Sequence, residues 1–195
     1  APTQEESPGT LAGVAYQVLR PCFTRAQPEP QRRGWLLALG GADPGDHTST
    51  CVAELLGGPP LTVIASDAIA ERQQLDQLLT PPTRHVAWMA PEALARALAS
   101  CEAALVSAST LSWEALATRT PIVALQTADN QVGVAATLRR AGIPVFMDPS
   151  EAAAALNSGR ASLPSAGAQI DGLGAWRVAQ ALGVPVTVPE HPDAR

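Results

Sequence analysis

The sequence predicts an α/β protein with a doubly wound, Rossmann-like parallel sheet of about six strands. Short apolar runs alternate with longer segments of helical periodicity, and the links between them are short and rich in Gly and Pro. Such an alternation, joined by right-handed crossovers, produces a parallel sheet covered by helices on both faces. The predicted strands are 34–39, 61–65, 86–89, 103–107, 121–125 and 143–147, and the predicted helices are 48–56, 68–79, 91–100, 111–118, 131–141 and 174–182.

The strands are assigned from continuous apolar runs rather than from alternating ones. Residues 34–39 read Gly-Trp-Leu-Leu-Ala-Leu and stop at a Gly-Gly pair, while 61–65 and 121–125 are rich in β-branched residues. Strands without a polar face are typical of parallel sheets, because helices bury both sides.

The helices are assigned from capping and stop signals. Asp46 or Thr48 is expected to cap the first helix, and a Pro-Pro pair ends the helix at 68–79. Pro91 occupies the first turn of the next helix, where its missing N–H costs nothing, and Gly142 suits the C-cap of the helix at 131–141.

One domain, residues 14–182, accounts for these elements. With 46% hydrophobic residues, a chain of 195 residues can bury one sizeable core. Residues 1–13 are expected to be a flexible lead-in, 157–169 a surface connection and 183–195 a tail.

Composition excludes several function classes. The net charge is −5 and no basic stripe exists, which argues against nucleic-acid binding. No apolar run is long enough to span a bilayer and no secretory signal is evident. Three scattered cysteines indicate reduced thiols and a cytoplasmic location, and the dispersed histidines predict neither a metal site nor a cofactor.

In a doubly wound sheet, ligands bind beyond the carboxyl ends of the strands. Gly40 and Gly41 follow the first predicted strand, and two glycines let the backbone approach a ligand closely. The alternative is an ordinary turn through Asp43 and Gly45. The pattern is neither GxGxxG nor a P-loop, so ordinary dinucleotide and P-loop sites are disfavoured.

The segment after the predicted strand 103–107 is the most informative in the chain. Ser107, Ser109 and Thr110 lead into a helix, whose N-terminal N–H groups attract phosphate. Glu114 lies about one turn further on and is placed to accept hydrogen bonds from a ribose diol. The alternative is a Ser N-cap followed by a solvated Glu.

Two further loops end at the same predicted edge. Trp88 and Met89 would supply an apolar wall for a flat base, or simply pack in the core. The polar loop at 126–131 would bring the amides of Asn130 and Gln131 to a sugar or phosphate. The alternative is that Asp129 or Asn130 caps the helix that follows.

At these residues the chain resembles the C-terminal half of the bacterial UDP-sugar hydrolases of pseudaminic acid synthesis. Those enzymes share the two-domain GT-B fold of the lipid-linked N-acetylglucosaminyltransferase of peptidoglycan synthesis. The resemblance runs from about residue 13 to 182. It rests on Leu-Gly-Gly-Ala-Asp at 39–43, Ser-Ala-Ser-Thr-Leu at 107–111 with Glu-Ala-Leu at 114–116, and Asp-Asn-Gln at 129–131, besides matching segments at 16–21 and 170–178.

The resemblance implies a UDP or UDP-sugar site. It places uracil on the backbone of Met89 and the ribose hydroxyls on Glu114. The diphosphate would lie on the two glycines and the turn at 107–111, with Asn130 and Gln131 near the diphosphate or the sugar. The implied binding residues are Gly40, Gly41, Met89, Ser107, Ser109, Thr110, Leu111, Glu114, Asn130 and Gln131.

The catalytic part of that family has no counterpart here. Its N-terminal half carries a Gly-rich loop and a His that acts as general base, and His47 is the one weak candidate in this chain. We therefore expect UDP binding without efficient turnover, the catalytic N-terminal domain being separate or missing. Whether the whole is an enzyme stays open: a hydrolase half, a GT-B glycosyltransferase half and a non-catalytic nucleotide-binding or scaffold protein are the alternatives. Apolar surface left by a missing domain would promote a homodimer.

Overall fold

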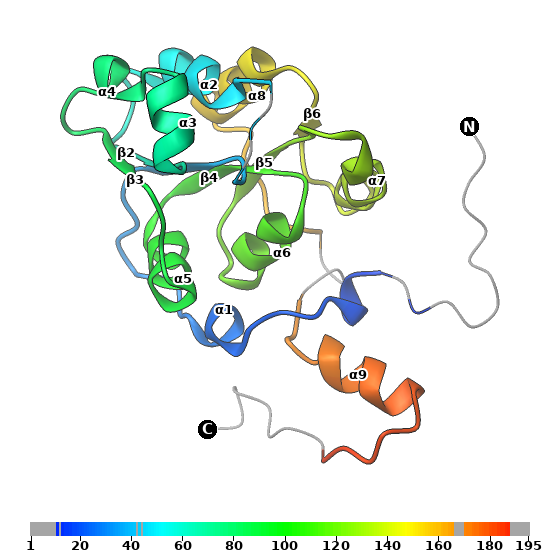
Figure 1. Ribbon diagram of the computed structural model, residues 1–195. Coiled ribbons are helices and arrows are strands. Elements are labelled where there is room, and N and C mark those ends of the chain that lie inside the picture. Colours follow the sequence, from blue (N-terminus) through cyan, green and yellow to red (C-terminus); the bar gives the residue numbers. More distant parts are fainter. Residues whose placement is uncertain (1–10, 12, 42, 44, 166–169, 188–195) are drawn as a thin grey trace.

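A computed structural model describes residues 11, 13–41, 43, 45–165 and 170–187. In this part of the chain the sheet has six strands, all parallel, in the order β3-β2-β1-β4-β5-β6 (Figure 1). The fold prediction is confirmed: this is the Rossmann strand order, which reverses direction between β1 and β4. The strands are β1 (Trp35–Ala38), β2 (Leu61–Ile64), β3 (Arg84–Val86), β4 (Ala103–Ser107), β5 (Ile122–Leu125) and β6 (Val145–Phe146).

Nine α-helices and two short 3-10 helices lie in the described residues. The α-helices are α1 (Pro21–Arg25), α2 (His47–Leu55), α3 (Asp67–Arg72), α4 (Leu75–Leu78), α5 (Pro91–Ser100), α6 (Thr110–Ala117), α7 (Val132–Arg140), α8 (Pro149–Asn157) and α9 (Gly174–Ala181). The 3-10 helices are η1 (Val14–Tyr16) and η2 (Asp129–Gln131).

The sheet separates two hydrophobic cores, which explains its continuous apolar strands. Leu36 points to the core that α1, α5, α6 and α7 cover, whereas Leu37 points to the core under α2, α3, α4 and α8. Figure 1 shows the second group of helices on one side of the sheet and α1, α5 and α6 on the other. Alternate residues of each strand therefore serve opposite cores.

Several boundaries differ from the predicted ones. The helix expected at 68–79 is divided into α3 and α4, because Gln74 adopts the left-handed conformation with φ 51°. The third strand ends at Val86 instead of beginning there, so Trp88 and Met89 lie in a loop. Helix α8 was not predicted, although Asp148 caps it by accepting a hydrogen bond from Glu151 N at 2.9 Å. Helix α1 was also not predicted.

The last described helix returns to the beginning of the domain. A Cβ on Gly174 would lie 2.1 Å from Gln17 O, so α9 packs on the N-terminal segment through a residue without a side chain. Arg177 pairs with Asp171 and donates a hydrogen bond to Ala15 O at 2.8 Å. Most of the predicted lead-in and tail lies outside the described residues. Within them, no helix has the length and apolar character needed to cross a membrane.

Candidate functional site

The loops proposed to bind a nucleotide meet at one edge of the sheet. Gly41 follows β1, Ser109 follows β4 and Gln131 follows β5. These three strands are neighbours and all run in the same direction, so their carboxyl ends, and the loops that follow, lie together. The edge also contains the point between β1 and β4 at which ligands bind in doubly wound sheets.

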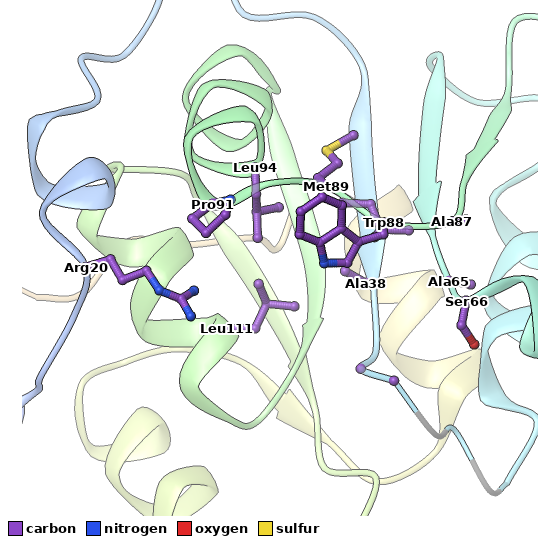
Figure 2. A pocket seen from close by; sticks show the side chains of 13 residues that line it. Arg20, Ala38, Ala65, Ser66, Ala87, Trp88, Met89, Pro91, Leu94 and Leu111 are labelled. Carbon is purple, nitrogen blue, oxygen red and sulfur yellow. The ribbon is translucent and has the colours of Figure 1, made fainter.

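A cavity of about 370 Å³ opens at this edge (Figure 2). Its walls come from the segments after β1, β2 and β3, from the starts of α5 and α6, and from one side chain before α1. The lining residues are Arg20, Ala38, Gly40, Gly41, Ile64, Ala65, Ser66, Ala87, Trp88, Met89, Pro91, Leu94 and Leu111. Four predicted site residues are thus brought together, namely Gly40, Gly41, Met89 and Leu111. The other six do not line the cavity.

Gly40 and Gly41 differ in whether their backbone conformation requires glycine. Gly40 has φ 106°, a conformation that strongly favours glycine. Gly41 has no such φ, and a Cβ built on it would meet nothing within 4 Å. Neither backbone conformation nor packing among the described residues explains the second glycine, although its backbone lines the cavity.

Asp43 holds the end of this glycine turn. Asp43 is 3% exposed as a residue, and its carboxylate accepts hydrogen bonds from His47 N at 3.1 Å, Thr48 N at 2.9 Å and Gln73 Nε2 at 2.8 Å. Of the two predicted caps, Asp46 occupies the N-cap position of α2, with a left-handed backbone, but its side chain makes no capping hydrogen bond. The first N–H groups of α2 donate instead to Asp43, which lies upstream of the N-cap.

The ionised form of Asp43 is favoured. Burial acts to raise its pKa, but hydrogen bonds from Thr48 and Gln73 and from the backbone of Thr48 and His47 outweigh that effect, and the pKa lies below the ordinary value of 3.8. A carboxylate therefore already occupies the N-terminus of α2. This is where a diphosphate lies in GxGxxG dinucleotide sites.

The turn after β4 is ordered by its own hydroxyl groups. Ser107 Oγ lies 2.8 Å from Ser109 Oγ, and Ser112 Oγ donates to Ser107 O at 2.7 Å. Ser109 accepts from Leu111 N at 3.3 Å and is the N-cap of α6, so the predicted Ser cap is present. Thr110 is exposed at the first position of the helix.

Glu114 is half-buried on α6, not a fully solvated helical Glu. Burial raises its pKa, and the positive charge of Arg20 opposes that rise. Arg20 lies at the N-cap of α1 and its guanidinium reaches toward Leu111 across the cavity (Figure 2). Sequence reasoning missed Arg20, because an isolated arginine ahead of the first strand carries no pattern that marks it.

The loop after β5 folds on itself. Gln131 Oε1 accepts from Thr127 N at 2.8 Å, and Gln131 Nε2 donates to Thr127 Oγ1 at 3.1 Å. Asn130 is exposed beside it. Neither Asp129 nor Asn130 caps the following helix in the described structure, so the predicted capping alternative was wrong for this loop. The amide of Gln131 rigidifies the loop.

The remaining titratable candidates lie away from the cavity. His47 is not among the lining residues, and its ring stands against Gly45 instead. His85 contacts the backbone of a lining residue, since its Nε2 lies 2.7 Å from Ala65 O. Across the described ranges, no group of three His, Cys, Asp or Glu side chains is arranged to hold a metal ion.

Comparison with known proteins finds a distant structural similarity, which does not bear on the function. No family model and no curated protein sequence matches the chain. Among solved structures it is similar to the glycotransferase of kitacinnamycin, at 19% identity and a TM-score of 0.46 over 78% of this chain. The chain spans 36% of the length of that protein. A likeness at this distance assigns no function. The strand order establishes a Rossmann-like α/β domain, and a cavity lies at the carboxyl end of its sheet.

Proposed function

We propose that this domain binds the UDP part of a UDP-sugar and is the donor-binding half of a two-domain, GT-B-type enzyme. The proposal rests mainly on the position of Gly41. Its backbone lines the cavity, and no described neighbour and no left-handed φ requires a glycine there. Gly41 lies at the edge where doubly wound sheets bind nucleotides. Because it has no Cβ, a ligand can approach its backbone closely.

The base is assigned to the wall formed by Trp88 and Met89. Neither the backbone N–H nor the C=O of Met89 makes a hydrogen bond with another described residue. One free donor beside one free acceptor complements an imide edge such as that of uracil. Trp88 is 74% exposed at the rim of the cavity, where its indole can cover a flat ring (Figure 2).

The diphosphate is assigned to the start of α6 rather than to that of α2. The Asp43 carboxylate already binds the N–H groups at the N-terminus of α2, so a diphosphate there would be repelled by its negative charge. The first turn of α6 lies across the cavity from the two glycines and has the partial positive charge of a helix N-terminus. Arg20 adds a full positive charge to the same cavity.

The remaining predicted residues are assigned to the sugars. Glu114 would accept hydrogen bonds from the ribose diol, and its partial burial would strengthen them. Ser107 and Ser109 shape the turn, Thr110 adds a hydroxyl, and Asn130 and Gln131 would contact the diphosphate or the transferred sugar, as the resemblance implies.

The reaction is assigned to residues beyond this cavity. None of its lining residues is an Asp, Glu, His or Cys, so the cavity itself offers no general base. Transfer of the sugar to an acceptor and hydrolysis by water both break the bond between the anomeric carbon and the diphosphate. One donor half therefore serves either reaction. The motif at 107–116 resembles that of the hydrolases of pseudaminic acid synthesis, whereas a Rossmann-like donor half suits a glycosyltransferase at least as well.

Calorimetric titration with UDP tests the proposal. We expect saturable heat with the unmodified chain, and an affinity about tenfold lower or worse for Gly41→Ala, because the added methyl occupies ligand space. Gly133→Ala is the matched control, since Gly133 also has open space at its Cβ but lies outside the cavity. No heat with the unmodified chain, or equal affinities for the unmodified chain and Gly41→Ala, would refute the proposed site.

A further inference from the structure

A second hollow, of about 550 Å³, lies beside the outermost strand β6. It is lined by Arg139, Gly142, Ile143, Pro144, Val145, Phe146, Arg160 and Ser162. Two of these residues are arginines and none is acidic, in a chain whose net charge is −5. The nucleotide cavity is built around β1, β2 and β3, so the two sites occupy different halves of the sheet.

The fold fixes the two arginine-bearing segments relative to each other. Arg139 lies in the last turn of α7, and Arg160 follows α8. Ser162 exchanges backbone hydrogen bonds with Ile122 of β5, at 2.9 and 3.0 Å, and its hydroxyl donates to Gly142 O at 3.0 Å. The backbones that carry the two guanidinium groups are thus tied to the same corner of the sheet.

Both guanidinium groups are positioned but not neutralised. The Arg160 guanidinium carbon lies over the Phe146 ring, 5.4 Å from its centroid. Arg139 Nη2 donates to Val145 O at 3.4 Å. Neither side chain forms an ion pair within the described part of the chain. An arginine has five N–H donors, so most of those on both groups stay available.

The backbone of β6 adds a further donor. Pro144 O and Phe146 O accept hydrogen bonds from Ala124 N and Gln126 N on the β5 side. Because successive residues of a strand point their backbone groups to opposite sides, the N–H of Val145 faces the open edge of the sheet. The hollow therefore combines a backbone N–H at the open edge of the sheet with two arginines that form no ion pair with any described residue.

We propose that this hollow binds a phosphate-type oxyanion, either free phosphate or the phosphate group of a small phosphate monoester. The planar forks of two arginines match the oxygen geometry of phosphate and allow bidentate contacts. The site is independent of the proposed nucleotide site, from which it is separated by the central strands.

The test is a titration of ¹⁵N-labelled protein with inorganic phosphate at constant ionic strength, followed by amide chemical shifts. We expect saturable shifts at 143–146 and 160–162 that persist with UDP present. Arg139→Gln and Arg160→Gln should each weaken binding about 3- to 10-fold. Arg140→Gln is the matched control, because Arg140 lies on the same helix outside the hollow and should leave the affinity unchanged.

Three results would overturn the proposal: shifts that rise linearly and equally with chloride, an equal loss of affinity in Arg140→Gln, or abolition of the shifts by UDP. The last result would place phosphate in the nucleotide cavity. The phosphate titration does not depend on UDP binding, so it still tests this proposal if the chain fails to bind UDP. Glycerol 3-phosphate identifies the source: binding at least as tight as that of phosphate indicates a monoester, and its rejection indicates free phosphate.

Discussion

Replacement of Asp43 by Asn should be among the most destabilising conservative changes in this domain. The carboxylate is buried and accepts three hydrogen bonds, from His47 N, Thr48 N and Gln73 Nε2. An Asn amide tolerates the left-handed backbone at φ 39° but presents an N–H₂ group to donors that need an acceptor. The loss of charge and of an acceptor should cost about 2–4 kcal/mol.

Asp46→Asn is the matched control. Asp46 also has a left-handed backbone, at φ 52°, but it is exposed and pairs with the half-exposed Arg72. Exposed ion pairs contribute about 1 kcal/mol or less. Urea unfolding should therefore separate the two variants, and the melting temperature of Asp43→Asn should fall by about 5–15 °C. Equal stability of the two variants would refute the assigned role of Asp43 as the anchor of α2.

The pH dependence gives a second readout for Asp43. Its pKa is lowered in the fold from the ordinary value of 3.8. The ionised carboxylate thus stabilises the fold at every pH above about 4, and this contribution is lost as the pH falls through the lowered pKa. The difference in unfolding free energy between the unmodified chain and Asp43→Asn should shrink in acid. A difference that stays constant down to the acid limit of folding would contradict this explanation.

The remaining predictions concern the nucleotide site and the thiols. Glu114→Gln should lower UDP affinity about tenfold or more, since a hydrogen bond to a charged group is lost, as calorimetry can measure. Burial raises the pKa of Glu114, so its ionised form destabilises the free domain at neutral pH. Glu114→Gln should therefore unfold at a higher urea concentration than the unmodified chain. If the variant gained UDP affinity as well as stability, the assigned role of Glu114 would be refuted. Burial raises the pKa of Cys51 and of Cys101 to about 12, whereas Cys22 is partly exposed. A thiol reagent should therefore label Cys22 first in the folded protein and all three cysteines after unfolding, and fast labelling of Cys51 or Cys101 in the native state would contradict their burial.

The sheet could be predicted because its strands carry a local signal. β4 is a continuous apolar run that ends at Ser107, and β5 is one that stops just before Gln126. Continuous apolar runs are typical of strands that are buried on both faces of a parallel sheet. Right-handed crossovers between parallel strands then limit the topology to a few arrangements, all of which place the strand ends at one edge. This is why four loops could be assigned to one edge of the sheet before any coordinates were considered.

The finer features of the site could not be predicted in the same way. The break at Gln74 depends on one left-handed residue inside an otherwise helical pattern. One of the three hydrogen bonds of Asp43 comes from Gln73, which is 30 positions away in sequence, and a tertiary contact of that kind leaves no local signal. Arg20 reaches the cavity from a segment outside the sheet. Sequence patterns locate the loops, whereas side-chain contacts over long sequence separations decide which residues line the cavity.

Amide chemical shifts of the ¹⁵N-labelled chain during a UDP titration test the central claim most directly. We predict saturable shifts at Gly40, Gly41, Met89 and 108–111, with His47 and Thr48 little affected because Asp43 occupies their N–H groups. Saturable shifts confined to other surfaces of the domain, or no saturable shift at all, would contradict a nucleotide site at the carboxyl end of the sheet.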